Sequence, residues 1–178
     1  MACIKELNNA ISYDCQGGTV NVAELYLINR SQVSAYTLNA GSDTMDTITL
    51  TSGAKTVPVE CYKAGVKVVE ALKSGDMRAG VDQSLTFTLY KKSGTDALIV
   101  KALLSGSFMA AVRFADLNAD KQILGVVSGL EISQLDTDSS ANGGFTTVTI
   151  KTPEDAIGES RMKLDDAAWN TIVTAKLL

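Results

Sequence analysis

The sequence predicts a mainly β fold, a sandwich or barrel, with one α-helix flanking the sheets. Residues 84–90, Ser-Leu-Thr-Phe-Thr-Leu-Tyr, alternate polar and apolar side chains with the period of two that marks a half-buried strand. Similar short runs recur at intervals of roughly ten residues and are separated by turn-forming residues, which is typical of sandwiches and barrels. Residues 93–104 instead carry apolar side chains at helical spacing.

In the first half of the chain, alternating apolar residues predict four strands, at 19–28, 33–38, 45–51 and 55–62. Turn-forming residues predict polar connections at 29–31, 39–43 and 74–82. Pro58 has no amide hydrogen, so the fourth strand belongs at the edge of a sheet or at a bulge.

Helical spacing predicts a helix over residues 93–104. Thr95 can cap its start, and Asp96 lies in the first turn, where the helix dipole favours a negative charge. Gly106 ends it. A helix of about three turns is too short to stand alone, so we expect its apolar face to lie against a sheet. That face comprises Leu98, Val100, Leu103 and Leu104.

The second half returns to strands, predicted at 108–114, 123–127, 129–133 and 145–150, with a turn at 116–121 and a polar loop at 135–144. Two segments leave helix and strand open. Residues 65–73 have apolar side chains at both spacings, and their β-branched valines favour a strand. In residues 164–178, Trp169, Ile172 and Val173 suit a helix, whereas the Thr-Ile-Val-Thr run suits a strand.

We expect one β-rich domain, residues 19–178, preceded by an N-terminal arm, residues 1–18. Within the arm, Leu7 and Ile11, together with Ile4, have helical spacing, and two glycines at 17–18 provide a flexible joint. A short first helix packed on its own core explains this pattern equally well.

Composition excludes several classes of function. The chain has a net charge of −4 and scattered basic residues, which is not the electrostatic pattern of a nucleic-acid-binding protein. No apolar run approaches the ~20 residues needed to span a membrane, and the first residues lack the pattern of a secretory signal. Three cysteines, Cys3, Cys15 and Cys61, favour reduced thiols made in a cytosol, although a Cys3–Cys15 bridge stays open.

The residues that usually carry catalysis are missing or poorly placed. The chain has no histidine, which removes the commonest general base and metal ligand. The Asp116-x-Asn118-x-Asp120 run lacks the Gly and Glu that a calcium loop needs, because Lys121 and Val127 stand at those positions.

The paired carboxylates lie in polar stretches where we expect them to be solvated: Asp136 and Asp138, and Asp165 and Asp166. Gly94-Thr95 opens a helix, but no lysine follows at the position a phosphate-binding loop requires. The sequence therefore predicts no catalytic residue, no cofactor site and no metal site, and a protein that is not an enzyme.

Residues 81–151 as a block resemble the tail tube (major tail) proteins of tailed bacteriophages. The segment 83–89 resembles the strand before that family's helix, and 96–104 resembles the helix itself. Residues 108–125 resemble the hairpin that follows, and 144–150 resemble the closing strand. The chain departs from the family in having Ala119 where a turn glycine is common, and in its long tail after Ile150.

The resemblance implies a β-sandwich closing toward a barrel and a structural role in the virion. Family members form stacked, hexameric rings whose inner strands join into one barrel, the conduit for DNA. By that likeness we expect homo-oligomers, contacts with other tail or neck proteins, and DNA passage without specific binding through a weakly acidic, Thr/Ser-rich lumen. The arm 1–18 and a hairpin at 41–58 would reach adjacent copies.

Three alternatives stay open. The first is a capsid decoration or connector protein of similar architecture. The second is a β-sandwich binding module for a sugar or a host surface, which the 6% aromatic content and the single Trp169 disfavour. An enzyme comes last.

Overall fold

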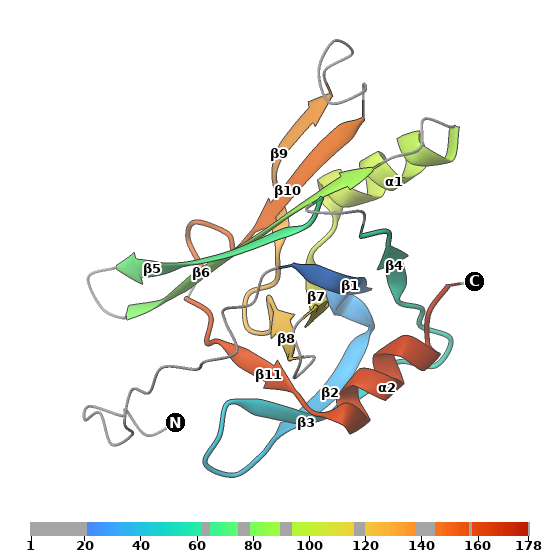
Figure 1. Ribbon diagram of the computed structural model, residues 1–178. Helices are drawn as coiled ribbons and strands as arrows, with labels where there is room; N and C mark the ends of the chain where they lie inside the picture. The colour runs from blue at the N-terminus through green and yellow to red at the C-terminus, as the bar shows by residue number, and fades with distance from the viewer. Residues whose placement is uncertain are drawn as a thin grey trace.

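The computed structural model describes residues 21–61, 65–74, 79–89, 94–115, 120–137, 145–156 and 158–177. Within them, eleven strands form two sheets. The larger sheet has the order β2-β3-β11-β8-β7-β1-β4, and the smaller has the order β5-β6-β10-β9 (Figure 1). Neighbouring strands are antiparallel, except that β11 runs parallel to β3.

The larger sheet comprises β1 (Val22–Asn29), β2 (Val33–Leu38), β3 (Thr44–Leu50), β4 (Val57–Val59), β7 (Phe108–Phe114), β8 (Lys121–Leu124) and β11 (Met162–Leu164). The smaller comprises β5 (Lys67–Ser74), β6 (Ala79–Leu89), β9 (Glu131–Thr137) and β10 (Thr146–Lys151). In the described part of the chain the helices are α1 (Gly94–Ser105) and α2 (Asp166–Thr174), with a single 3-10 turn at Arg30–Gln32.

The central strands of the larger sheet are buried on both faces. In β1, Leu25 and Leu27 belong to the core shared with the smaller sheet, whereas Tyr26 and Ile28 belong to a second core on the opposite face. Strand β7 alternates in the same way. Two-sided burial explains why both strands read as continuous apolar runs rather than as alternating ones.

The first core fills the sandwich between the two sheets. Leu85 and Phe87 of β6 and Val148 and Ile150 of β10 are at most 1% exposed there. Leu103 of α1 joins them. Apolar burial of this kind is the main driving force for folding, and it holds the smaller sheet on the larger.

The second core joins the larger sheet to α2, and Ala168, Trp169 and Ile172 supply the buried face of the helix. Asp165 caps the start of the helix by accepting from the Asp166 amide at 2.6 Å. Residues 164–178, which left helix and strand open, therefore contain a helix, as the spacing of Trp169 and Ile172 indicates. It adds a second helix to the one that the sequence predicted.

Most predicted strands are confirmed. Residues 65–73, which left helix and strand open, contain strand β5. Pro58 lies in β4 at the edge of the larger sheet, as expected. Two predicted loops were too long. Strand β6 begins at Ala79 inside the expected 74–82 loop, and β9 extends to Thr137 inside the expected 135–144 loop. The start of β6 is held extended by pairing with β5, and the end of β9 by pairing with β10. In both places pairing overrides a weak strand propensity.

The expected hairpin at 41–58 is wrong. Strand β3 pairs with β2 and β11, while β4 pairs with β1 at the opposite edge of the sheet. The chain between them, near Thr56, is instead held by the end of α2: the Thr56 amide donates to the Ala175 carbonyl at 3.1 Å. The turn at Gly53 therefore belongs to a connection between opposite sides of the sheet and not to a hairpin.

The expected packing of α1 is also only partly right. Leu103 is 4% exposed, but Leu98 and Leu104 are 68% and 61% exposed. The helix lies beside the smaller sheet, next to β9, so only one side of it meets the core (Figure 1). The side chains of Thr95 and Asp96, and the arm 1–18, lie outside the described residues.

Candidate assembly surface

The smaller sheet ends in two strands whose outer edges meet no other strand in the described part of the chain. Its order places β5 at one edge and β9 at the other. Backbone donors and acceptors along such an edge are a ready template for pairing with another chain. A natural protein blunts its edges unless it uses them, so these two edges are the first candidate for an assembly site.

Charge differs between the two edges. On the sheet face that points away from the sandwich, β5 presents Lys67 and Val69, both exposed. On the same face, β9 presents Glu131, Gln134 and Asp136, all exposed. The basic edge and the acidic edge therefore belong to opposite ends of one sheet.

Between the edges, this outer face is rich in hydroxyl groups. Ser84, Thr86 and Thr88 of β6 pair across the ladder with Lys151, Thr149 and Thr147 of β10. The Thr86 and Thr149 hydroxyl oxygens are 3.0 Å apart, which makes a hydrogen bond between the strands. The face is thus polar and carries few charges.

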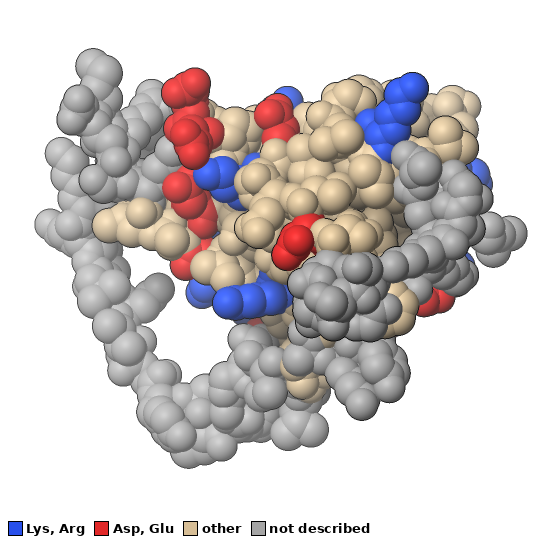
Figure 2. All heavy atoms as spheres, turned by 90° about the horizontal axis from the view of Figure 1, so that it is seen from above, with Lys and Arg blue, Asp and Glu red and all other residues tan. Residues whose placement is uncertain are grey.

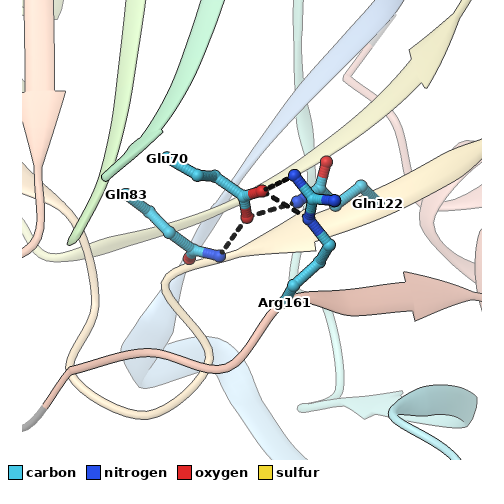
Figure 3. A network of polar contacts seen from close by, with 4 residues as sticks. All are labelled: Glu70, Gln83, Gln122 and Arg161. Atoms are coloured by element: carbon cyan, nitrogen blue, oxygen red, sulfur yellow. Dashed lines mark hydrogen bonds and ion pairs between the residues drawn. The ribbon is translucent and has the colours of Figure 1, made fainter. Parts of the chain in front are cut away.

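A polar network, buried at Gln83 and Gln122 and exposed at Arg161, fixes β5 against the rest of the molecule (Figure 3). Glu70 of β5 accepts from Gln83 Nε2 at 3.0 Å, from Gln122 Nε2 at 2.6 Å and from Arg161 Nε at 2.5 Å. Gln83, only 1% exposed, also accepts from the Gly125 amide at 2.9 Å through its Oε1. Because each buried group has partners, the network holds the edge strand in one position.

A second buried carboxylate ties the 126–128 bend to the smaller sheet. Glu159 is 2% exposed, and it accepts from the Val127 amide at 2.9 Å and the Ser128 amide at 2.6 Å. Its own backbone exchanges two hydrogen bonds of 2.9 Å with Val81 of β6. Hydrogen bonds from two amides satisfy this buried carboxyl group.

Neither Gln83 nor Glu159 was predicted from the sequence as a buried polar group. A signal did exist for Gln83, because it occupies an inward position in the alternation that continues through Leu85 and Phe87, where a polar side chain must be buried. Glu159 lies in a polar stretch where its burial has no local signal. Both groups serve packing, and neither lies beside a nucleophile.

The sequence-predicted carboxylates are placed as follows. Asp136, Asp165 and Asp166 are exposed, as their polar surroundings predict, and Asp166 pairs with Lys121. Asp120, just before β8, pairs with Lys163, and its Oδ2 lies 3.7 Å from the Lys163 Nζ. Residues 116, 118 and 138 lie outside the described part, and among described residues no three acidic or thiol side chains are grouped to hold a metal.

Cys61 is a free thiol, half-buried beside the first core. Burial, and then the nearby Glu24 carboxylate, raise its pKa to about 11. The thiol is therefore protonated at neutral pH and is a poor nucleophile. Cys3 and Cys15 lie outside the described residues. Whether they are thiols or form a bridge therefore stays a prediction.

Charge is sparse on the face seen in Figure 2, where described acidic and basic side chains form small separate groups on a mainly uncharged surface. No described helix combines the length and apolarity needed to cross a bilayer. The described basic side chains on this face form no stripe that would follow a phosphate backbone.

An apolar cavity of about 350 Å³ opens under α1, beside the edge strand β4 of the larger sheet. Its walls include Val57 and Pro58 of β4, Phe87 of β6, and Ile99 and Leu103 of α1. A volume of this size falls at the lower end of the range for small-molecule and peptide side-chain pockets.

Comparison with known proteins adds no relationship. No family model matches the chain, and no curated protein or solved structure matches it.

Proposed function

We propose that this chain is a structural virion subunit, the building block of a bacteriophage tail tube, that assembles into stacked rings through the two free edges of its smaller sheet. The observation that carries the proposal is the pair of complementary edges, basic on β5 and acidic on β9. Function then lies in polymerisation, and no enzymatic role is proposed. Other tail or neck proteins would bind the ends of the tube, and the assembled protein would reside in the virion.

Strand direction supports ring closure. The four strands alternate in direction, so β5 and β9 run in opposite senses. Rotation about a ring axis preserves each direction, and β9 of one copy therefore meets β5 of the next as an antiparallel pair. Such a contact is heterologous and closes into a ring when the rotation fits a whole number of copies.

Residue register supports the charge match. Across the ladders, Lys67 lies level with Gln134, and Val69 lies level with Glu131. If neighbouring copies join at the same level, Lys67 is diagonal to both Glu131 and Asp136; if they shift by two residues, it lies opposite Asp136. Long side chains reach each other in either arrangement, and opposite charges there are stabilising.

A closed ring of this kind has an open centre. Six copies of a four-stranded sheet would form a barrel of 24 strands. At ordinary strand spacing and tilt, such a barrel would be roughly 40–50 Å across, far wider than one filled by its own side chains. The Thr-rich outer face of the sheet would line this channel, where Lys67 and Lys151 are offset by Glu131 and Asp136, so we expect no net positive charge toward DNA.

Light scattering and negative-stain microscopy of the purified full chain test the proposal. We expect rings or hollow rods at high protein concentration. Lys67→Glu should abolish them, because it sets like charges against each other at every junction, and Lys67→Glu/Asp136→Lys should restore them. Lys55→Glu, an equal charge change at an exposed loop residue, is the matched control and should assemble normally.

A chain that stays monomeric at high concentration would refute the proposal. So would rings that form equally well with and without Lys67→Glu, because the junction would then lie elsewhere. Single particles that bind only to capsids would favour the decoration role, and a glycan-binding monomer would favour the binding module.

A further inference from the structure

The cavity under α1 remains open at the surface, and its surroundings are apolar. Ile99, Ala102 and Leu103 face it from α1. Leu98, one turn before Ala102, is 68% exposed and extends the apolar surface along the helix. Adjoining exposed and recessed apolar groups of this kind mark a docking site rather than a chance surface leucine.

The edge strand at the cavity is poorly suited to accept another strand. β4 has only three residues, and its central residue, Pro58, has no amide hydrogen to donate. An occupant that relies on backbone pairing is therefore disfavoured. An amphipathic helix, which satisfies its own backbone and inserts side chains, suits an apolar groove beside a helix.

The chain itself carries a segment with that pattern. Ile4, Leu7 and Ile11 have the i, i+3, i+7 spacing of side chains that a helix presents to a groove. Between them lie Lys5, Glu6 and two asparagines, which suit a solvated opposite face. Most of the cavity wall is aliphatic or aromatic and matches these three apolar groups, while Asn29, Glu60 and Thr88 add polar groups to the lining.

The place where the segment joins the domain indicates which copy it reaches. Asn21 accepts from the Ala115 amide, and Val22 pairs with Phe114, at one end of β1 and β7. The cavity lies at the other end of these strands, where Asn29 pairs with Phe108. The two ends are about 23 Å apart along β1. Both faces of the strand between them are covered by core, so a return within the same copy would have to run outside one of the two covering layers.

We infer that residues 1–18 of one copy dock, through Ile4, Leu7 and Ile11, in the cavity between α1 and β4 of a second copy. This inference rests on the proposed assembly and adds a second contact to it. Donor and acceptor lie at opposite ends of the domain, so the contact runs head to tail and does not close on itself within a pair. It would connect each ring to the next, whereas the β5–β9 junction closes the ring.

Disulfide trapping between two separately produced chains tests the inference. The native cysteines are first replaced by Cys3→Ser, Cys15→Ser and Cys61→Ala. One chain then carries Leu7→Cys, and the other carries Ala102→Cys at an exposed cavity residue. After mixing and mild oxidation, we expect a disulfide between the chains to form at least tenfold faster than with Asn9→Cys, which lies on the opposite face of the same helical pattern.

Each other outcome overturns the inference. A chain carrying both cysteines that links only to itself, with no link in the mixture, would show that the arm occupies its own cavity. Equal rates for Leu7→Cys and Asn9→Cys would show that the arm does not dock by this face. Microscopy of the same samples separates the two proposals: rings without the disulfide refute only the arm contact, and the disulfide without rings refutes only the ring.

Discussion

Tyr26 and Trp169 meet edge to face, with ring centroids 5.5 Å apart and an angle of 81° between the ring planes. This contact joins strand β1 of the larger sheet to α2, and Trp169 is only 7% exposed. Aromatic pairs in this geometry add about 0.5–1.5 kcal/mol to the stabilisation from burial alone. The C-terminal helix is therefore a structural layer of the domain.

Removal of this contact should destabilise the domain strongly. We expect Trp169→Ala to lower the free energy of unfolding by about 3–5 kcal/mol, because it leaves a cavity where an aromatic ring was buried. Trp169→Phe keeps a ring against Tyr26 and should cost clearly less. Urea unfolding followed by circular dichroism, at a concentration where the chain is monomeric, measures both. Equal losses for the two variants would contradict the role of the ring contact.

The buried Glu159 provides a second test of stability. Glu159→Ala leaves the Val127 and Ser128 amides without their acceptor, and we expect it to cost about 2–4 kcal/mol of unfolding free energy. Glu154 is the matched control: its side chain is 84% exposed and pairs with Lys151. Glu154→Ala should therefore change stability by less than about 1 kcal/mol. Similar values for the two would mean that the bend is not held through Glu159.

The sequence was most informative where a strand has one dominant environment. Alternation located β6 and β10 because one face of the smaller sheet is buried and the other polar. The continuous apolar run of β7 located the strand but did not show that a second layer covers its far face. Trp169 and Ile172 supply that layer, and only tertiary structure decides between helix and strand for such a short segment.

The errors in placing strands share one cause, which is pairing between distant segments. Residues 79–82 have weak strand propensity, yet β6 begins there because β5 pairs with them. Strands β3 and β4 follow one another in sequence but lie far apart in the sheet, because β3 pairs with β11 and β4 pairs with β1. The candidate edges of β5 and β9 could not be found from sequence for the same reason: an edge is defined by the order of strands.

Cys61 should react slowly with alkylating reagents. With its pKa raised from 9.0 to about 11, the thiolate fraction at neutral pH is about 100-fold lower than for an ordinary thiol. In a Cys3→Ser/Cys15→Ser background, the rate with iodoacetamide should rise about tenfold per pH unit until near pH 11. Glu24→Gln removes the second cause of the shift and should speed the reaction at a given pH. A rate that levels off near pH 9 would contradict the burial of this thiol.

The same shift has a consequence for stability. Below pH 9 the thiol is protonated in both the folded and the unfolded chain, and pH has no effect through this group. Between about pH 9 and pH 11 the unfolded chain loses the proton while the folded chain keeps it, so the free energy of unfolding falls as pH rises. Cys61→Ala should remove this part of the pH dependence, which unfolding curves at pH 8 and pH 10.5 would measure.

The proposed channel makes a prediction about DNA. If the Thr-rich face of the smaller sheet lines the channel, wild-type tubes assembled with short duplex DNA should retain little of it after washing, because the phosphates meet few cations. Thr86→Lys/Thr149→Lys adds two cations per copy at adjacent cross-strand positions. Tubes of this variant should retain DNA at 50 mM salt and release most of it at 200 mM, because each neutralised phosphate makes binding more dependent on salt.

Nuclease treatment distinguishes the inside of the tube from the outside. DNA held in the channel should resist digestion, whereas DNA on an outer surface should not. The matched control is Asn170→Lys/Thr174→Lys, which adds the same charge on the exposed side of α2. DNA bound by that variant should be digested, since α2 lies on the far side of the larger sheet from the proposed channel. If the lysines at 86 and 149 instead hold DNA that nuclease degrades, this face points outward and the smaller sheet does not line the tube.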